Sequence, residues 1–219
     1  MKSYNQYCTV ARALDVVGDR WVLLIVRELL TFGPSRYSDL KRGLPGIATN
    51  LLAERLKTME SDGLIEHRVA PAPVGSPVYE LTDRGRALDD VLSALTRWGL
   101  PTMPSGPSAN DAVQPQWTAL FAGLTLHEGL APDQRITLGI RTDGGAVRVA
   151  LDPDGFAIER GLDDEVDVTL AGPDQLVGGV LAGLLTVREA KDLGLEINGG
   201  TALLADLVTS ARTKVGDRG

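Results

Sequence analysis

The sequence holds little of what catalytic, secreted or membrane-spanning proteins depend on. Its 219 residues include one cysteine, Cys8, and two histidines, His67 and His127. A single cysteine excludes an intramolecular disulfide and a multi-cysteine metal site. The longest uncharged apolar runs, Trp21–Val26 and Leu176–Val187, are shorter than the roughly 18 residues of a membrane span. The N-terminus lacks the apolar segment of a signal peptide, so we expect a cytoplasmic protein with no membrane partner.

Motifs that carry catalysis are missing as well. The sequence has no Gly-x-Ser-x-Gly elbow, no His-Glu-x-x-His pair and no glycine-rich phosphate loop. His127 lies at the end of a predicted helix, where an imidazole more often meets the helix dipole than acts as a base. His67 lies in a predicted strand and is expected to be a surface residue. We therefore expect no enzymatic activity, no cofactor and no metal.

The net charge of −7 argues against a nucleic-acid partner until the chain is divided. Residues 1–100 hold 13 Lys/Arg and 12 Asp/Glu, a net charge of +1, whereas residues 101–219 hold 9 and 17, a net charge of −8. Between them, residues 101–115 read PTMPSGPSANDAVQP, and prolines at this density prevent a continuous helix. This pattern predicts two domains, 1–100 and 116–219, joined by a proline-rich linker.

The first domain is predicted to be mainly helical with a short two-stranded sheet. Apolar spacing over Val10–Leu30, interrupted at Gly18-Asp19, predicts two helices, the second with Asp19 as its N-cap. Ser35–Arg42 is predicted to form a short helix. The remaining elements are a helix over Thr49–Ser61 with Leu52, Leu56 and Met59 inward, strands over Leu64–Val69 and Val78–Leu81, and a helix from Thr82-Asp83 to Trp98 with Leu88, Val91, Leu92 and Leu95 inward. This order is typical of a winged helix-turn-helix.

Three segments of this domain resemble the HxlR-type winged-helix transcriptional regulators. They are CTVARALDVVGDRW followed by LLIVRELL, then RYSDLKRGLPGIATNLLAERLKTMESDGLI, and finally YELTDRGRAL with LTRWG. The resemblance spans about residues 5–100. It implies a homodimer that binds a pseudo-palindromic operator in double-stranded DNA. It also implies that the first and last helices form the dimer interface, near Tyr4, Tyr7, Val10, Leu14, Leu92, Leu95 and Trp98.

The helix over Thr49–Ser61 is predicted to read the DNA bases. Its apolar residues face inward, so Thr49, Asn50 and Ala53 face outward; Asn50 can bond adenine, and the other two can touch a thymine methyl group. Other polar side chains are candidates for phosphate contacts, which position the protein without specifying sequence. These are Arg36, Ser38, Lys41, Arg42, Arg55, Lys57 and Arg68.

The second domain is predicted to be an α+β layer, a mostly antiparallel sheet with helices on one face. Helices are expected over Trp117–Gly129, with Trp117, Leu120, Phe121 and Leu124 inward, and over Pro173–Leu185, Val187–Leu193 and Thr201–Ala211. Strands are expected over Arg135–Arg141, Ala146–Leu151, Phe156–Arg160, Val166–Leu170 and Leu195–Asn198.

The run DVTLAGPDQLVGGVLAGLLTVREAKDLGLEINGGTALLADLV resembles the C-terminal half of sterol-carrier-protein-like domains. That resemblance implies an apolar tunnel for a lipid or acyl group, and such domains also serve purely for dimerisation. Small residues at Gly178, Gly179, Ala182 and Gly183 can leave space beside a helix or allow close packing. Candidate lining residues are Leu120, Phe121, Leu124, Leu176, Val180, Leu184 and Leu204.

The sequence as a whole predicts a dimeric transcriptional regulator, expected to be a repressor, with an apolar small-molecule effector as a candidate partner. One alternative is a lipid-binding or carrier protein whose winged helix makes protein contacts. Another is a thiol-based redox sensor acting through Cys8, since some relatives carry a sensing cysteine there; the competing interpretation is a small apolar residue packed in the first helix.

Overall fold

The computed structural model describes residues 3–69, 75–103, 108, 110–162 and 165–216. The chain divides into two compact units, Met1–Leu95 and Thr96–Gly219. This boundary falls inside a helix, α6, upstream of the proline-rich residues 101–115. Parts of that segment (104–107 and 109) and of the predicted loop between the wing strands (70–74) lie outside the described residues.

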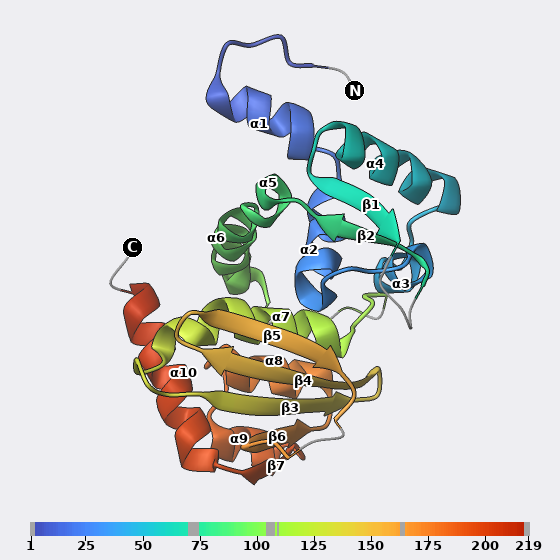
Figure 1. Ribbon diagram of the computed structural model, residues 1–219. Coiled ribbons are helices and arrows are strands. Elements are labelled where there is room, and N and C mark those ends of the chain that lie inside the picture. The colour runs from blue at the N-terminus through green and yellow to red at the C-terminus, as the bar shows by residue number, and fades with distance from the viewer. Residues whose placement is uncertain (1–2, 70–74, 104–107, 109, 163–164, 217–219) are drawn as a thin grey trace. The chain divides into compact units, whose positions relative to one another are not determined.

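The first unit contains helices around a small apolar core and one two-stranded sheet (Figure 1). Its elements are α1 (Thr9–Val17), α2 (Val22–Phe32), α3 (Tyr37–Gly43), α4 (Thr49–Ser61), β1 (Ile65–Val69), β2 (Pro77–Leu81), α5 (Asp83–Arg86) and α6 (Asp89–Gly99), which crosses the boundary between the units. The core takes side chains from α2, α3, α4 and both strands. The predicted order of elements is confirmed from the first helix to the second wing strand.

The predicted break between the first two helices is present. α1 ends at Val17, and the Asp19 carboxylate accepts a hydrogen bond from the backbone N–H of Trp21 at 3.1 Å. Trp21, not Asp19, is the residue that precedes the first helical residue of α2, but Asp19 still supplies an acceptor for an N–H group at this helix start. The buried residues of α2 then follow helical spacing: Val22, Ile25, Val26 and Leu29.

The single helix predicted from Thr82 to Trp98 is wrong, because the structure has two helices there, α5 and α6. The Thr82 hydroxyl caps α5 by accepting a hydrogen bond from the Gly85 N–H at 3.1 Å. The Leu88 N–H then donates to the carbonyl of Gly85, three residues earlier, instead of to a residue four earlier as in a continuing α-helix. Gly85 lies against the strand, since a Cβ there would be 2.0 Å from the Leu64 carbonyl oxygen. This tertiary approach fixes α5, and α6 starts in a new direction.

The wing is a regular antiparallel pair with one extra connection. β1 pairs with β2 from Ile65 opposite Leu81 to Val69 opposite Pro77. Ser35, just before α3, exchanges two backbone hydrogen bonds of 2.9 Å with Tyr79 of β2. The wing is therefore attached to the start of α3.

The second unit contains a five-stranded sheet and the remaining helices (Figure 1). Its elements are η1 (Leu100–Thr102), α7 (Pro115–Leu126), η2 (His127–Gly129), β3 (Ile136–Thr142), β4 (Gly145–Asp152), β5 (Gly155–Arg160), β6 (Val168–Ala171), α8 (Asp174–Leu181), α9 (Val187–Asp192), β7 (Glu196–Gly199) and α10 (Thr201–Gly216). The strand order is β5-β4-β3-β6-β7, and the β3–β6 pair is parallel while the others are antiparallel.

One face of this sheet is apolar and covered. Cross-strand register places Ile136 beside Leu151, and Leu138 between Val149 and Val168, and all five side chains are buried. α7 packs across β3, β4 and β5, and α8 packs against α7. Strict alternation of apolar residues in β3 and β4 therefore predicted the covered face correctly.

The connection from β5 to β6 reaches the opposite face. Leu162 lies against the middle of that face, since a Cβ on Gly139 would be 2.6 Å from its methyl carbon. Glycine at this position of β3 allows that close approach. The parallel β3–β6 pair follows from this crossover, because parallel neighbours cannot be joined by a tight hairpin.

Candidate nucleic-acid interface

A short connection orients α4 against α3. Leu44 and Ile47 of this connection are buried, and Gly46 has a φ of +86°, a conformation that favours glycine. On α4 itself, Leu52, Leu56 and Met59 are buried. The opposite face of α4 is therefore left in solvent by the same periodicity that builds the core.

The exposed face of α4 carries the residues predicted to read bases. Thr49, Asn50 and Ala53 are all exposed on its first two turns. The residue before the helix is Ala48, and its side chain makes no capping bond in the described structure. The N–H groups of the first turn thus lie beside two polar side chains, an arrangement that suits acceptors on base edges and phosphates.

The side chains predicted to contact phosphates fall into two groups. Arg36, Ser38, Arg42 and Lys57 are exposed. Arg42 also pairs with Asp39 of its own helix, yet 66% of its side chain remains accessible. These four residues lie on α3, at its start, and on α4, so the structure places them on the two helices of the helix-turn-helix.

The second group, Lys41, Arg55 and Arg68, is engaged within the protein. Arg55 lies 2.9 Å from the Asp19 carboxylate and 3.0 Å from Glu54, and only 19% of its side chain is exposed. Burial acts to lower the pKa of Arg55, but the carboxylates of Asp19 and Glu54 together outweigh it, and the pKa is raised. Arg55 therefore ties α4 to the turn before α2, a partner that no sequence pattern indicates.

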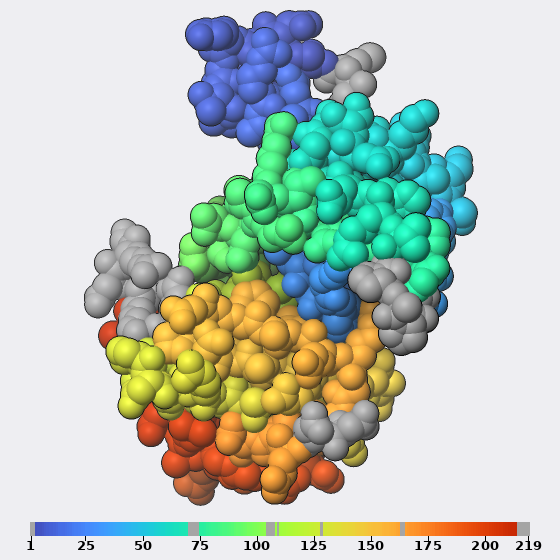
Figure 2. All heavy atoms as spheres, viewed as in Figure 1, coloured from blue at the N-terminus to red at the C-terminus, as the bar shows by residue number. Residues whose placement is uncertain are grey.

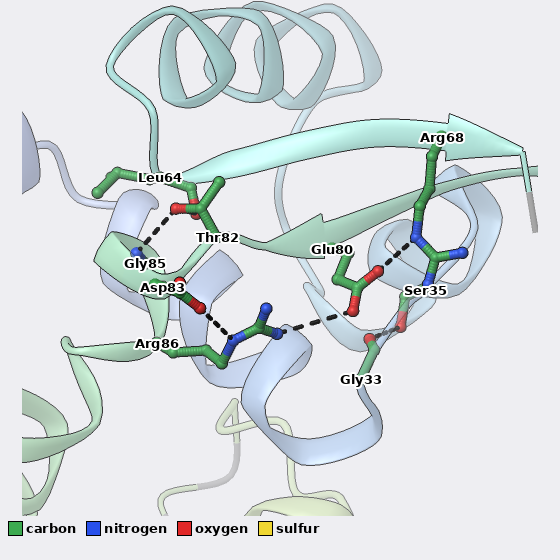
Figure 3. Close-up of polar contacts among 9 residues, drawn as sticks. All are labelled: Gly33, Ser35, Leu64, Arg68, Glu80, Thr82, Asp83, Gly85 and Arg86. Carbon is green, nitrogen blue, oxygen red and sulfur yellow. Dashed lines mark hydrogen bonds and ion pairs between the residues drawn. The ribbon is translucent and has the colours of Figure 1, made fainter.

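Arg68 belongs to a chain of charged groups between the wing and α5 (Figure 3). Its Nε donates to Glu80 of the adjacent strand. The other oxygen of Glu80 lies 3.7 Å from Arg86, which lies 3.6 Å from Asp83. Glu80 thus faces two guanidinium groups, and the position of Arg68 on the wing is fixed by its cross-strand neighbour.

The aromatic side of the wing is packed against the helices. The ring of His67 stacks on that of Tyr79, with centroids 4.8 Å apart. Burial, with smaller contributions from the charges of Glu60 and Tyr37, raises the pKa of Tyr79. His67 is exposed, as predicted, and its ring covers part of Tyr79.

Two side chains of α3 hold the connection to α4. The Tyr37 hydroxyl donates to the backbone carbonyl of Thr49 at 2.7 Å, and the Lys41 ammonium donates to the carbonyl of Ile47. Sequence reasoning did not single out Tyr37 and assigned Lys41 to phosphate. The spacing of Tyr37 and Lys41 is the sequence signal that could have indicated a shared role, because residues four apart lie on one face of a helix.

The residues expected near a dimer interface form two apolar faces, one on α1 with the segment before it and one on α6. Val10 and Leu14 are exposed on α1, and Tyr4 and Tyr7 are exposed in the segment before it, with Tyr7 fully accessible. Figure 2 shows the amino-terminal segment and α1 standing out from the rest of this unit. On α6, Val91, Leu95 and Trp98 are exposed, whereas Leu92 packs against the core. The prediction that Val91 and Leu95 face the core is therefore wrong within a single chain, because α6 presents only Leu92 to it.

Asp15 fixes the segment before α1. Its carboxylate accepts from the Tyr4 N–H and from the Ser3 hydroxyl, both at 2.8 Å. The Tyr4 N–H, followed by Ser3, lowers the pKa of Asp15. Cys8 lies between this segment and the helix, exposed, at the position that precedes the first residue of α1. It is not packed in the helix, contrary to the apolar interpretation.

A hollow in the second unit lies between the α8–α9 connection and α10. It measures about 460 Å³. Its lining combines apolar and hydroxyl side chains with one arginine: Val180, Gly183, Leu185, Thr186, Val187, Ala205, Val208, Thr209, Arg212 and Thr213.

The predicted ligand-lining residues lie mostly elsewhere in this unit. Val180 lines the hollow, while Leu120, Leu124 and Leu204 are buried in the core. Phe121 and Leu176 are half-buried, and Leu184 is 47% exposed. The structure therefore brings one of the seven to this hollow and does not bring the others to it.

Two other features, a membrane-spanning helix and a metal-binding cluster, are not found among the described residues. None of the helices in the described ranges is long and apolar enough to span a membrane. Among the residues whose positions are described, no group of three or more His, Cys, Asp or Glu side chains is placed to hold a metal ion.

The first unit is therefore a winged helix-turn-helix with an exposed second helix. A sequence profile of the HxlR-like helix-turn-helix family matches residues 16–106. YvaP, an HTH-type transcriptional regulator of Bacillus subtilis, is 38% identical over 87 residues, which cover 40% of this chain and 80% of YvaP. YodB, an HTH-type transcriptional regulator of the same organism, is 35% identical over 86 residues, covering 39% of this chain and 76% of YodB.

Among solved structures, the reduced form of YodB from B. subtilis is similar with a TM-score of 0.40 and 31% identity, covering 47% of this chain and all of that one. On the sequence matches, the chain belongs to the HxlR-like helix-turn-helix family. It is a transcriptional regulator of this type. The matched residues end at position 106, so the family assignment rests on the first unit and α6.

Proposed function

We propose that the protein binds a pseudo-palindromic operator in double-stranded DNA as a homodimer and represses transcription. The observation that carries this proposal is the exposed polar face of α4, where Thr49, Asn50 and Ala53 lie opposite the buried Leu52, Leu56 and Met59. A helix that buries one face and leaves a polar face in solvent fits the major groove. One such helix reads few base pairs, and a symmetric pair doubles the site.

Selection of duplexes from a random pool, followed by titration at several salt concentrations, tests DNA binding. We expect one enriched pseudo-palindrome and a steep loss of affinity with salt, because phosphate neutralisation releases counterions. Asn50→Ala should relax the preference for the selected sequence, whereas Arg42→Ala should weaken selected and scrambled duplexes about equally. A uniform loss for Asn50→Ala contradicts its base-reading role. A lipid carrier that uses its winged helix for protein contacts would show no steep salt dependence on duplex DNA.

The homodimer is supported by the apolar faces of α1 and α6. Exposed apolar side chains that gather on two helices mark an interaction surface, and Trp98 is 81% exposed. We expect Trp98→Ala and Tyr7→Ala each to weaken self-association by about 2 kcal/mol, the scale of a buried aromatic anchor. Val69→Ala is the control, since Val69 is 69% exposed on the wing strand. Sedimentation analysis of the three variants decides this, and unchanged association of both helix variants contradicts the proposed interface.

We infer further that the second unit is a sterol-carrier-like domain that accepts an apolar or acyl effector. The hollow beside α10 supports this, because its volume of about 460 Å³ falls in the range of small-molecule sites. Native mass spectrometry with organic extraction tests it. We expect the wild-type protein to carry an added mass from a bound ligand. Ala205→Phe, which fills part of the lining, should remove that mass. Ala202→Phe, on an exposed face of the same helix, should keep it. Clean apo protomers of wild type leave dimerisation as the role of this unit.

A redox response is a second candidate function, favoured by the exposure of Cys8 beside the exposed Tyr7 and Val10. Peroxide would oxidise an accessible thiol to a sulfenic acid, adding a polar group to this apolar face. Treatment of wild type and Cys8→Ser with peroxide, followed by DNA titration, tests the idea. Equal affinity of treated and untreated wild type contradicts it.

A further inference from the structure

α3 presents two hydrogen-bond donors to the start of α4 from a single face. Tyr37 is the first residue of α3, and its hydroxyl donates to the carbonyl of Thr49, the first residue of α4, at 2.7 Å. Lys41 follows one turn later and donates to the carbonyl of Ile47. The two donors therefore meet the chain on either side of Ala48.

The two acceptors, the carbonyls of Ile47 and Thr49, lie where the chain enters α4. Ile47 is buried in the core, so its backbone is anchored on one side by packing and on the other by Lys41. Ala48 has an extended backbone and makes no side-chain cap in the described structure. The residue before α4 thus supplies no capping side chain. Tyr37 and Lys41 instead donate side-chain hydrogen bonds to backbone carbonyls at the start of this helix and just before it.

The engagement of Lys41 differs from that of its neighbour Arg42. The Lys41 side chain is half-buried and its ammonium is directed to a backbone carbonyl of its own chain. Arg42 is 66% exposed, and it pairs with the carboxylate of Asp39 on the same helix. An exposed guanidinium can turn to a phosphate, whereas a half-buried ammonium must give up its carbonyl partner to do so.

We propose that Tyr37 and Lys41 are positioning residues that set the direction of α4 and thereby its discrimination between DNA sequences, and that Lys41 does not contact phosphate. This inference rests on the proposed DNA-binding function. Base recognition needs side chains held to within about 0.5 Å of their working positions, while phosphate contacts by exposed, flexible side chains tolerate more. Loss of either donor should therefore reduce sequence preference more than overall affinity.

The test compares Lys41→Met with Arg42→Met in the whole 219-residue chain. Both substitutions remove a cation from α3, and both retain a long unbranched side chain. We expect Lys41→Met to leave the slope of log affinity against log salt unchanged and to reduce the affinity ratio of selected to scrambled duplex about tenfold, the share of one direct base contact. Arg42→Met should lower that slope by about one per protomer and leave the ratio unchanged.

Tyr37→Phe provides an uncharged second variant. It removes only the hydroxyl, so we expect the same loss of discrimination, again without a change in salt slope. Lys41→Gln keeps a donor without the charge, and we expect it to recover at least part of the ratio lost in Lys41→Met. The double variant Tyr37→Phe, Lys41→Met should lose less than the product of the single losses, because both donors act on one element.

Hydrogen exchange in the free protein separates this inference from the DNA-binding proposal. We expect faster exchange of the amides from Leu44 to Ala53 in Lys41→Met and Tyr37→Phe, and unchanged exchange in β1 and β2. A salt slope that falls by about one for Lys41→Met, with discrimination intact, makes Lys41 a phosphate contact and overturns the inference. Unchanged discrimination in both variants overturns it as well. A wild-type protein with no salt-dependent duplex binding overturns the proposed function and this inference together, whatever the exchange shows.

Discussion

The two units use their apolar residues in different ways. In the second unit, the apolar face of the sheet is covered by its own helices, with Leu138, Val149 and Val168 fully buried. In the first unit, the core is built, but Tyr7 before α1 and Leu95 of α6 still expose aromatic and aliphatic side chains. Their charges differ as well, with a net +1 over residues 1–100 and −8 over residues 101–219. The first unit thus exposes apolar side chains that a partner could cover, whereas the second unit covers the apolar face of its sheet with its own helices.

The largest expected effect breaks that completed core. Leu138→Ala removes a fully buried side chain from the middle of β3, and the lost contacts and residual cavity should cost about 2–5 kcal/mol of unfolding free energy. Leu184→Ala is the control, because Leu184 is 47% exposed and should cost less than about 0.5 kcal/mol. Denaturant unfolding followed by circular dichroism measures both, and equal costs would mean that β3 is not central to the core.

The next effect tests a buried charge in the first unit. A Cβ at Gly43 would be 2.1 Å from the Glu28 carboxylate, and Glu28 is itself buried and paired with Arg27 at 2.8 Å. Gly43→Ala should therefore destabilise by about 1–3 kcal/mol, because a confined carboxylate has to move. Ala48→Gly, at the exposed residue before α4, is a comparison that should change stability by only a few tenths, because a better N-cap residue offsets the greater backbone freedom of glycine. Thermal unfolding checks it, and an unchanged midpoint for Gly43→Ala would contradict the close approach.

The sequence was most informative where local spacing alone decides the structure. α4 spans Thr49–Ser61 as predicted, because its inward apolar residues and the flanking turns are all local signals. β3 and β4 likewise follow from alternation and a turn at Asp143-Gly144. The exposed face of α4 follows from the same periodicity, so the candidate base-reading residues could be placed without a structure.

The remaining features depend on contacts between distant residues. The break between α5 and α6 comes from Gly85 lying against the carbonyl of Leu64, 21 positions earlier in the chain. Arg55 was assigned to phosphate because a cation on an exposed helix looks free, and its partner Asp19 lies two helices away. The hollow beside α10 was missed because its lining joins the α8–α9 connection to α10, a pairing that no periodicity reveals.

A smaller effect sharpens the comparison within the second unit. Gly178 lies in α8, and a Cβ there would meet no described atom within 4 Å. Gly178→Ala should therefore stabilise the protein by about 0.5–1 kcal/mol through helix propensity alone. Gly179→Ala, one position on, would place its Cβ 2.9 Å from Leu185 and should lose that gain. Unfolding free energies of the two variants decide whether this small-residue stripe leaves space or packs closely.

The smallest expected effect concerns one carboxylate at the parallel strand pair. Asp167 accepts from the N–H and the hydroxyl of Thr137, both at 2.7 Å, and the N–H followed by the hydroxyl lowers the pKa of Asp167. A lowered folded-state pKa stabilises the protein above the ordinary carboxyl pKa of about 4, and that stabilisation is lost as pH falls through the folded-state pKa. Because Asp167 is exposed, we expect only a few tenths of a kcal/mol. Asp167→Asn should show a flatter decline in stability below about pH 4.

In the first unit, protonation of the Asp15 carboxylate should change self-association and not the free energy of unfolding. Asp15 holds Ser3 and Tyr4 outside the core, so its protonation frees a surface segment without opening packed structure. Its pKa is lowered by the Tyr4 N–H and then by Ser3, so this release also belongs to the range below about pH 4. Asp15→Asn should leave the unfolding midpoint at pH 7 unchanged and weaken self-association, because Tyr4 belongs to the exposed apolar segment before α1. A shifted midpoint with unchanged sedimentation would instead assign this segment to the fold of the monomer and remove it from the proposed interface.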